Sequence, residues 1–590
     1  MSSADYIDDG IFGNPRTRAY DFMKAQNDKH ANDIALDYLG VKISYEKLFE
    51  EIELFASALN SSGIASGDYV TIVLPNIPEI VYLFYACNRL GVVANLIDPR
   101  TNAEAIVERT NRSSSKMLFI LSDVLNDKVR PFLKHLNTKR IVTITPTDSL
   151  KDKAFVNLKT SLVKIVYGFK RYRYADDRVV PLKDFLVWKN VNFVDSVFIG
   201  NTPCAIVYTS GTDGGRAKGV VLSNESFNSM PSMQMEKQEG YERQNTFLGC
   251  IPFFSAYGAV NGMHNSLCNG WIIQLIPTFD PMDFDLLIKK YKPNNALGVP
   301  RFWESLVESR RLKNMDLGFL ILPTCGGDKI TPVSVERINS FFEKRGSKAR
   351  LIVGYGATEF GGAFSVTVAD RSLYEPGSVG IFMDGVIGRI IDHETGMEIE
   401  GREIEGELCV FSPSMMLGYF KDEEETKKIT WYDQEGRKYY RTGDKVRIDS
   451  KGLNWVIDRY KRVIIRPDGH TVGASPIENE ISQNKYVKKC AVVGMTVDNG
   501  AGAIPTAFVV LKNGLNWTER EAFACIDENC RKKLPERDRA LAYVLVSELP
   551  YTPMGKVDFR KLEETKFGDI EAYWVEDPLT KGLSRIGRIL

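Results

Sequence analysis

Residues 208–221 read YTSGTDGGRAKGVV, a run of hydroxyl groups, glycines and cations where a core would carry apolar residues. Glycine lets backbone N–H groups approach an anion closely, and hydroxyls add neutral donors. Lys218 adds a mobile positive charge. The pattern is typical of a loop that holds a polyphosphate, and the alternative is a surface hairpin with a glycine-rich turn. The candidate donors are Thr209, Ser210, Gly211, Thr212, Gly214 and Gly215.

The segments on either side of this run predict a strand, a loop and a second strand. Residues 204–208 are apolar and rich in β-formers, and residues 220–222 can begin the next strand. A Walker-type loop needs G-x-x-x-x-G-K, then serine or threonine, and then a helix. Lys218 is instead followed by Gly219 and two valines, so the sequence argues against a Walker-type kinase or ATPase.

The run resembles the phosphate loop of the adenylate-forming superfamily, whose common form is S/T-S-G-T-T-G-x-P-K-G. That superfamily includes acyl-CoA synthetases, firefly luciferases and the adenylation domains of peptide synthetases. This chain has Asp213 where a second threonine is usual, one extra residue before the lysine, and Ala217 in place of the proline. An acidic side chain beside a triphosphate is unfavourable unless it points away or helps to hold Mg²⁺. We therefore expect the loop geometry to differ there.

Four further motifs resemble those of the superfamily and follow in its order. They read GYGATE at 354–359, YRTGD at 440–444, DRYKR at 458–462 and LPYTPMGK at 549–556. The resemblance implies that Tyr355 stacks near adenine, that Glu359 helps to bind Mg²⁺ together with Thr209, and that Asp444 accepts the ribose hydroxyls. A hard dication prefers carboxylate and phosphate oxygens, so one well-placed glutamate suffices.

The resemblance also assigns the catalytic groups, Lys556, Glu359 and Lys218. Lys556 would bridge the attacking carboxylate and the α-phosphate of ATP, and no protein nucleophile is needed. The implied ATP or AMP contacts are Thr209, Ser210, Gly211, Thr212, Gly214, Lys218, Gly326, Gly327, Gly354, Tyr355, Gly356, Ala357, Thr358, Glu359, Asp444, Arg459 and Lys556.

In relatives the C-terminal domain rotates after adenylation, so that a pantetheine tunnel replaces the lysine. The resemblance places the hinge at Arg462, where Asp, Glu or Lys are common, and the tunnel loop around Gly469 and His470. This loop has one residue more than usual.

A chain of 590 residues is too long for one compact core, so we expect at least two domains. Apolar runs at 70–74 and 117–121 alternate with a helix at 78–89, which favours α/β layers. Strands at 489–494, 506–511 and 542–546 around a helix at 519–533 predict a small α+β domain. The predicted fold is thus a large N-terminal α/β domain, residues 1–457, and a small mobile C-terminal domain, residues 458–590.

The substrate class is inferred from residues 251–258, IPFFSAYG. They resemble the superfamily's PLFHxxG, with Ser255 in place of the usual histidine. Amino-acid-activating relatives carry an aspartate near this point, and this chain has none. A buried ammonium without a partner is costly, so an amino acid is disfavoured. The predicted apolar acyl or aryl pocket contains Phe254, Ser255, Tyr257, Gly258 and Met263; alternatively, these residues only pack the core.

Composition agrees with a large enzyme that has no nucleic-acid partner, since Lys plus Arg equals Asp plus Glu at 76 each. Nine cysteines without a paired pattern indicate reduced thiols in the cytoplasm, and five histidines show no zinc-ligand spacing. No signal peptide or spanning segment is expected. A basic segment, residues 164–173, is either a solvated face or a peripheral contact with an anionic membrane.

The sequence therefore predicts an ATP-dependent acyl-CoA synthetase that uses Mg²⁺ and coenzyme A and acts on a small carboxylic acid as a monomer or homodimer. Three alternatives stay open. The acceptor could be the pantetheine thiol of a carrier protein, the enzyme could be a luciferase-like oxygenase, or the chain could be a catalytically idle acyl- or nucleotide-binding relative.

Overall fold

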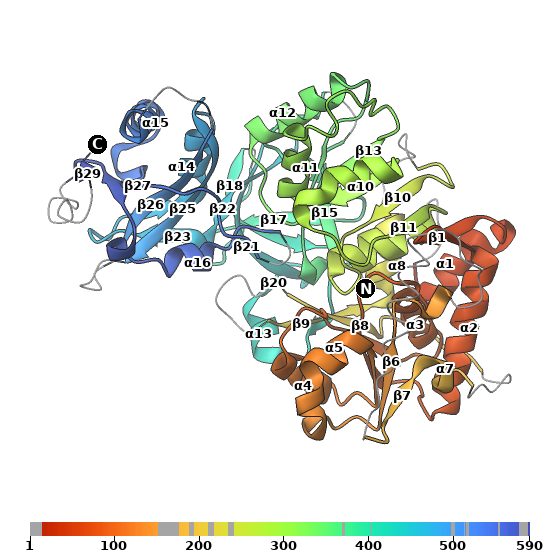
Figure 1. Ribbon diagram of the computed structural model, residues 1–590. Helices are drawn as coiled ribbons and strands as arrows, with labels where there is room; N and C mark the ends of the chain where they lie inside the picture. The colour runs from red at the N-terminus through yellow and green to blue at the C-terminus, as the bar shows by residue number, and fades with distance from the viewer. Residues whose placement is uncertain are drawn as a thin grey trace.

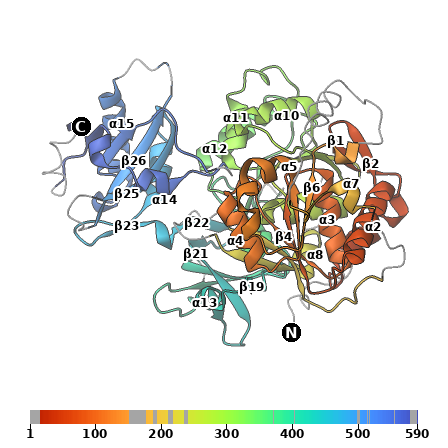
Figure 2. The ribbon, with the colours of Figure 1, turned by 60° about the horizontal axis from the view of Figure 1, so that its bottom comes forward.

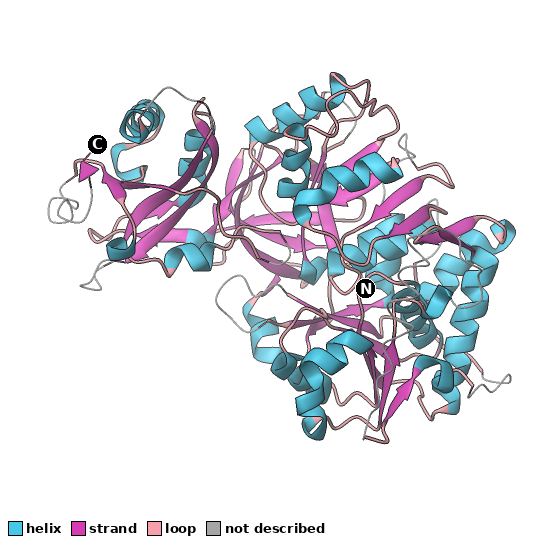
Figure 3. Cartoon of the chain, viewed as in Figure 1, coloured by secondary structure: helices cyan, strands magenta, loops and turns pink. Residues whose placement is uncertain are grey.

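The computed structural model describes residues 15–150, 176–187, 194–209, 217–233, 241–368, 372–401, 403–496, 502–512, 514, 518–552, 555–577 and 588–589. A large N-terminal part of β-sheets and helices adjoins a smaller C-terminal part, and the predicted α/β and α+β classes are confirmed (Figure 1, Figure 3). Within the described ranges, each helix is too short or too polar to cross a bilayer. All nine cysteines are free thiols. The basic segment 164–173 lies outside the described residues.

The first layer of the N-terminal part is an eight-stranded sheet. Its five neighbouring pairs from β8 to β7 are parallel, and β8–β9 and β9–β19 are antiparallel. In spatial order the strands are β19 (Gly418–Tyr419), β9 (Gly219–Ser223), β8 (Pro203–Tyr208), β4 (Val93–Leu96), β3 (Tyr69–Val73), β5 (Met117–Leu121), β6 (Arg140–Ile144) and β7 (Val179–Pro181).

A nine-stranded sheet forms the second layer and supplies most of the site. Its central strands, from β1 to β14, are parallel, so their carboxyl ends meet at one edge. In spatial order the strands are β16 (Ile381–Phe382), β15 (Gly362–Val366), β14 (Ile352–Ala357), β13 (Leu322–Cys325), β12 (Asn295–Gly298), β10 (Thr246–Gly249), β11 (Ile272–Leu275), β1 (Ile34–Tyr38) and β2 (Val41–Ser44).

Helix α3 (Pro78–Arg89) shows how these layers are held together. It begins with a proline at its first position, where the missing N–H leaves no helical bond unmade. All but its last residue are buried, and its side chains share one hydrophobic cluster with strands of both sheets. The other main helices of this part are α1 (Ala19–Asn27), α2 (Tyr45–Ser61), α4 (Ala103–Arg112), α8 (Asn224–Ser232), α10 (Phe284–Tyr291), α11 (Pro300–Val307) and α12 (Pro332–Glu343).

An antiparallel five-stranded sheet leads to the C-terminal part. Its strands are β17 (Ile387–Ile391), β18 (Ile404–Phe411), β20 (Thr430–Tyr432), β21 (Lys438–Ile448) and β22 (Asn454–Arg459), and helix α13 (Glu423–Lys428) precedes β20. β22 pairs with β21 as far as Arg459, so the predicted boundary at 457/458 falls inside a strand.

The C-terminal part builds its own apolar core, since two hydrophobic clusters consist only of residues 464–575. It contains the hairpin β23 (Val463–Ile465) and β24 (Thr471–Gly473) and the sheet β25 (Val487–Thr496), β26 (Ala503–Leu511), β27 (Ala542–Leu545), β28 (Ala572–Trp574) and β29 (Arg588–Ile589). Its helices are α14 (Ala474–Ser482), α15 (Glu519–Lys533) and the short α16 (Phe559–Glu563).

The C-terminal part adjoins β21 and β22 in two views of the molecule (Figure 1, Figure 2). Two ion pairs join it to helix α11. Lys489 Nζ lies 2.9 Å from Glu304 Oε2, and Arg301 Nη2 lies 2.5 Å from Glu548 Oε1. Arg301 also stacks on the ring of Tyr551, 3.8 Å from its centroid. These contacts seat the end of the chain over the carboxyl edge of the nine-stranded sheet.

Candidate functional site

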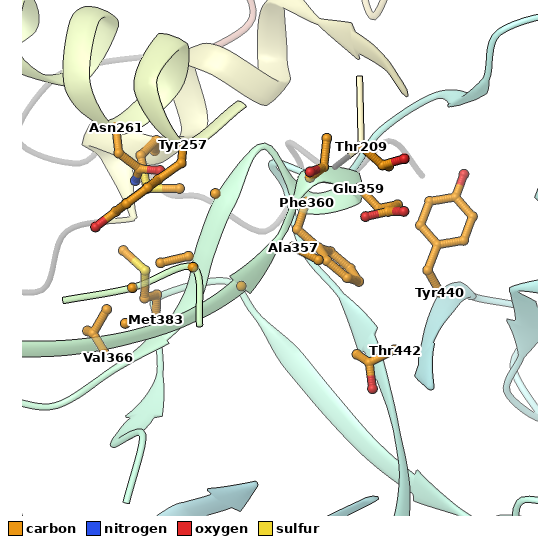
Figure 4. A pocket seen from close by; sticks show the side chains of 18 of the residues that line it. Thr209, Tyr257, Asn261, Ala357, Glu359, Phe360, Val366, Met383, Tyr440 and Thr442 are labelled. Atoms are coloured by element: carbon orange, nitrogen blue, oxygen red, sulfur yellow. The ribbon is translucent and has the colours of Figure 1, made fainter. Parts of the chain in front are cut away.

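A cavity of about 980 Å³ brings together most of the described residues that the motifs predicted. Its wall contains Thr209, Lys218, Gly326, Gly327, Gly354, Gly356, Ala357, Thr358, Glu359, Arg459 and Lys556. Ser210, Gly211, Thr212 and Gly214 lie outside the described residues. Figure 4 shows Thr209, Glu359 and Tyr440 at one end of the cavity, and Tyr257, Asn261, Val366 and Met383 at the other.

The predicted strand–loop–strand unit is formed by β8, the phosphate run and β9. The two strands are antiparallel, and their hydrogen bonding continues to the next pair of residues, Thr209 and Lys218. Thr209 N–H donates to the carbonyl of Lys218 at 3.0 Å, and Lys218 N–H donates to Thr209 Oγ1 at 3.0 Å. The two ends of the loop are thereby fixed side by side at the cavity.

Lys218 is paired with a carboxylate that the motifs did not reveal. Its Nζ lies 2.5 Å from Glu425 Oε2 and 4.7 Å from the centroid of the Tyr419 ring. Lys218 and then Lys428 lower the pKa of Glu425 to about 2. Asp422 caps helix α13 by accepting from the N–H of Glu425, which holds the carboxylate toward the loop. The loop lysine is thus held by an ion pair that a phosphate would have to replace.

Glu359 follows β14 on a single 3-10 turn, Thr358–Phe360, which ends at Gly361 with φ +68°. Its Oε1 accepts a hydrogen bond of 2.7 Å from the hydroxyl of Tyr419 on β19. Among the described residues, no three His, Cys, Asp or Glu side chains gather to hold a metal. One carboxylate and the Thr209 hydroxyl still fit Mg²⁺, because Mg²⁺ keeps several waters and takes its remaining ligands from substrate phosphates.

Asp444 is buried and already holds two partners. Its Oδ2 accepts from the Tyr355 hydroxyl at 2.6 Å, and its Oδ1 accepts from Arg459 Nε at 3.0 Å. Burial raises the pKa of Asp444, and the charge of Arg459 opposes that shift. Tyr355 packs edge to face on Phe364, with ring centroids 4.7 Å apart. The chain neighbours Gly354, Gly356 and Gly443 line the cavity, and a direct contact of Tyr355 or Asp444 with a nucleotide stays a prediction.

Lys556 reaches the cavity from the C-terminal part. Its loop closes on itself through a 2.8 Å bond from Thr552 N–H to the carbonyl of Lys556. The neighbouring Val557 N–H donates to Asp328 Oδ2 at 3.3 Å across the two parts. Burial raises the pKa of Asp328, and the positive charge of Lys556 opposes that shift. The loop is thus seated on the residues that follow β13.

The predicted hinge and tunnel residues belong to the C-terminal part and are not found in the described cavity wall. Arg462 donates to Glu478 Oε1 at 2.7 Å and to the carbonyl of Val492 at 3.3 Å. Gly469 has φ +78° in the turn between β23 and β24, and His470 Nε2 lies 2.6 Å from Asp538 Oδ1.

Of the five predicted acyl-pocket residues, only Tyr257 is found in the described cavity wall. Phe254 and Met263 belong to the large buried apolar cluster. Ser255 donates to the carbonyl of Pro252 at 2.7 Å and accepts from Gly258 N–H at 3.2 Å. Serine therefore starts the helical turn in the place where relatives carry histidine. A side chain at Gly258 would lie 1.9 Å from the Pro252 carbonyl, so glycine is required for packing.

Much of the remaining wall consists of residues that carried no motif. One set of them is spread over residues 230–383, and a local pattern could not have found this set because its proximity comes from strand order. They include Met230, Tyr241, Phe247, Asn261, Asn265, Trp271, Asn295, Leu297, Leu322, Thr324, Ile352, Ala363, Val366 and Met383.

Comparisons with known proteins agree with this geometry. A family model described as AMP-binding enzyme matches residues 23–420, and the model of the AMP-binding enzyme C-terminal domain matches residues 476–556. The chain is 28% identical to a probable 4-coumarate–CoA ligase 3 of Dictyostelium discoideum, over 80% of this chain and 81% of that protein. It is 27% identical to a long-chain-fatty-acid–CoA ligase of Bacillus subtilis, over 90% and 92%.

A solved structure has the same fold at lower identity. The benzoate CoA ligase of Burkholderia xenovorans superposes with a TM-score of 0.77 at 19% identity, covering 93% of this chain and all of that one. The likeness therefore extends over both parts of the molecule.

Proposed function

The chain belongs to the AMP-binding enzyme family of the adenylate-forming superfamily, and from this premise we propose that it is an AMP-forming acid–CoA ligase. The proposal is that it joins a carboxylic acid to coenzyme A in two steps, with ATP converted to AMP and pyrophosphate. One observation carries it: three distant segments meet at one cavity, and they bring Thr209 and Lys218, Glu359, and Lys556 to its wall. Two of the relatives, named as CoA ligases for 4-coumarate and for long-chain fatty acids, support the same class.

The first step forms an acyl-adenylate. A carboxylate oxygen of the acid attacks the α-phosphorus of ATP, the bond to the bridging oxygen breaks, and pyrophosphate leaves with the electron pair. We propose that the positive charge of Lys556 lies between the attacking carboxylate and the α-phosphate. Lys218 binds the departing pyrophosphate. Preorganised charges of this kind act without a protein nucleophile or general base.

Glu359 and Thr209 would hold Mg²⁺ together with phosphate oxygens, and the ion would supply positive charge that offsets the phosphates of ATP. Tyr419 keeps the carboxylate of Glu359 oriented through the 2.7 Å hydrogen bond. We assign to the ribose side of the site a hydrogen-bonded group of three side chains, Asp444, Arg459 and Tyr355.

The second step transfers the acyl group to the CoA thiol. The thiol loses its proton to solvent, its sulfur attacks the carbonyl carbon of the adenylate, and AMP leaves as the carbon–oxygen bond breaks. We propose that residues 458–590 turn about Arg462 between the steps, which would withdraw Lys556 and bring Gly469 and His470 to the site. The nine free thiols favour a reducing compartment, and we place the enzyme in the cytoplasm.

The hinge is tested by two substitutions at one position. Arg462→Pro restricts the backbone, whereas Arg462→Ala removes only the guanidinium that holds Glu478. The proline variant should spare pyrophosphate release and block thioester formation, and the alanine variant should keep both steps coupled. Equal loss of both steps in the proline variant would count against a hinge there.

The function itself is tested with the purified chain, ATP and Mg²⁺ and a panel of short, medium, long and aromatic acids. We expect acid-dependent pyrophosphate release, followed by AMP and thioester when CoA is added. A parallel assay with a holo-carrier protein in place of CoA distinguishes the two acceptors, because a carrier-loading ligase would acylate the carrier protein. The absence of pyrophosphate with every acid in the panel would favour an idle binding relative.

A further inference from the structure

One helical segment presents three polar side chains to the cavity. Residues Tyr257–His264 form a π-helical stretch that continues directly into α9 (Asn265–Cys268). Tyr257, Asn261 and Asn265 follow one another at intervals of four residues, and all three line the cavity. Residues at this spacing share one face of a helix, and π-helical stretches are frequent at functional sites. Figure 4 shows Tyr257 and Asn261 projecting from this segment.

Three buried polar atoms in this part of the wall lack a hydrogen-bond partner among the described residues. They are the hydroxyl of Tyr257, Oδ1 of Asn261 and Nε1 of Trp271. Native proteins satisfy most buried polar atoms, and one left unpaired costs about 1–3 kcal/mol. The cluster therefore points to a group that arrives with the substrate.

The Trp271 ring is held in place by its neighbours. It stacks on Phe247 with ring centroids 6.1 Å apart and lies 5.5 Å from the ring of Tyr241. Only 4% of Trp271 is exposed. Its indole N–H is therefore a fixed donor with little freedom to find a partner elsewhere.

Tyr257 and Trp271 can be ordered along the cavity. A Cβ at Gly326 would lie 3.2 Å from the Tyr257 hydroxyl, and a Cβ at the next residue, Gly327, would lie 3.8 Å from Lys556 Cε. Tyr257 is thus at the end where the reacting carboxylate is proposed to bind. Trp271 directly precedes β11, at the amino ends of strands whose carboxyl ends carry the nucleotide side. It lies toward the far end of the cavity, beyond Tyr257.

The facing wall is apolar. Ile352 and Val366 come from β14 and β15, and Ala363 and Met383 complete this side. Figure 4 shows Val366 and Met383 across the cavity from Tyr257 and Asn261. One wall can therefore pack a flat or extended hydrocarbon surface, while the other offers hydrogen bonds along one edge.

We propose that the acid activated here carries a hydroxyl group beyond its carboxylate, on an otherwise apolar aryl or acyl skeleton. Tyr257 binds next to the carboxylate, and the distal hydroxyl accepts from Trp271 Nε1 and donates to Asn261 Oδ1. This inference rests on the proposed ligase function and names its substrate class. An unsubstituted fatty or aryl acid would bury the same polar atoms without partners, and sites built for a hydrogen-bonding substrate discriminate strongly against the analogue that lacks the group.

The test compares matched acids with the purified chain, ATP, Mg²⁺ and CoA. Suitable pairs are cinnamic and 4-hydroxycinnamic acid, and octanoic and 8-hydroxyoctanoic acid. In at least one pair we expect the oxygenated member to have a kcat/KM at least about tenfold higher, which corresponds to about 1.4 kcal/mol. Equal or higher kcat/KM for the unsubstituted member of both pairs overturns the inference and leaves the ligase function intact. Pyrophosphate release with neither pair, nor with the wider acid panel, overturns the ligase function and this inference with it.

Two substitutions locate the effect. Asn261→Leu and Trp271→Phe remove hydrogen-bonding atoms while keeping most of the side-chain volume, and each should shift the preference at least fivefold toward the unsubstituted acid without changing the KM for ATP. Asn60→Leu, on α2 away from the cavity, is the matched control. Thermal melting of each variant with and without the acid and AMP reports folding separately from turnover. An unchanged preference in both folded variants would contradict the assignment.

Discussion

The two ends of the cavity differ in whether their polar side chains have partners within the protein. On the nucleotide side three charged groups have named partners: Lys218 has Glu425, Glu359 has Tyr419, and Asp444 has Arg459. On the acyl side Tyr257 and Asn261 are neutral, and each has a buried oxygen without a partner in the part of the chain that the structure describes. A buried charge without a partner costs far more than an unpaired neutral group. The charged side chains are therefore paired with protein groups that a bound substrate can replace. The neutral groups can stay unpaired until a substrate binds.

Lys556→Ala gives the largest expected change on the nucleotide side. Removal of one preorganised charge typically costs about 10² to 10³ in rate, and acid-dependent pyrophosphate exchange should fall by that factor. The reaction of supplied acyl-adenylate with CoA should persist. Lys561→Ala, an exposed lysine on α16, should leave both steps unchanged. Exchange at the parent rate in Lys556→Ala would remove the lysine from the mechanism.

Asp444→Asn tests whether the carboxylate that holds Tyr355 and Arg459 also serves ATP. The substitution keeps the shape but removes the charge that holds Arg459 and Tyr355. Hydrogen bonds to charged groups contribute about 1.5–3 kcal/mol, so the KM for ATP should rise by about 10- to 100-fold. The KM for the acid should change little. A larger effect on the acid than on ATP would break the division between the two ends.

Glu425→Gln should act in the opposite direction and more weakly. Glu425 competes with phosphate for Lys218, and partly exposed pairs contribute about 0.2–1 kcal/mol. The KM for ATP should therefore fall by up to about fivefold, whereas Glu424→Gln on the same helix should have no effect. Because Lys218 and Lys428 lower the pKa of Glu425 to about 2, the pair is complete above the usual glutamate pKa and is lost only as pH falls through that value. A fall in KM that varies between pH 6 and 9 would contradict this pairing.

Tyr257→Phe should act in the opposite direction to Asp444→Asn on stability. The hydroxyl is buried with no partner among the described residues, so its removal from the free protein should raise the unfolding free energy, by up to about 1–3 kcal/mol. Asp444→Asn leaves Arg459 without its carboxylate and should lower the melting temperature. Chemical denaturation of both variants measures the contrast. A destabilised Tyr257→Phe would mean that the hydroxyl is already bonded.

Much of the nucleotide side could be predicted because its residues come in short runs. The cavity wall contains Thr209, Lys218, Glu359 and Lys556. The 2.6 Å hydrogen bond from the Tyr355 hydroxyl to Asp444 could not be predicted, because it joins two motifs that lie far apart in the sequence. Ser255 differs because a local helix start uses its hydroxyl.

On the acyl side, the sequence predicted only one of the residues that line the cavity. Tyr257 belongs to a motif, whereas Asn261 and Trp271 belong to none. Each of these positions needs only a residue that fits its local helix or strand, so the chain carries no local signal of the cavity.

The sequence by itself determined the family, the strand and loop around the phosphate run, and the lysine near the C-terminus, because phosphate binding uses consecutive backbone amides and a few charges at fixed spacing. The tertiary structure alone decided which partners hold those charges and which neutral groups face the acid. Glu425 comes to Lys218 from 207 residues away along the chain, and Trp271 comes to Phe247 across two neighbouring parallel strands. Such contacts depend on strand order and sheet packing, which bring distant residues together without leaving a pattern in either segment.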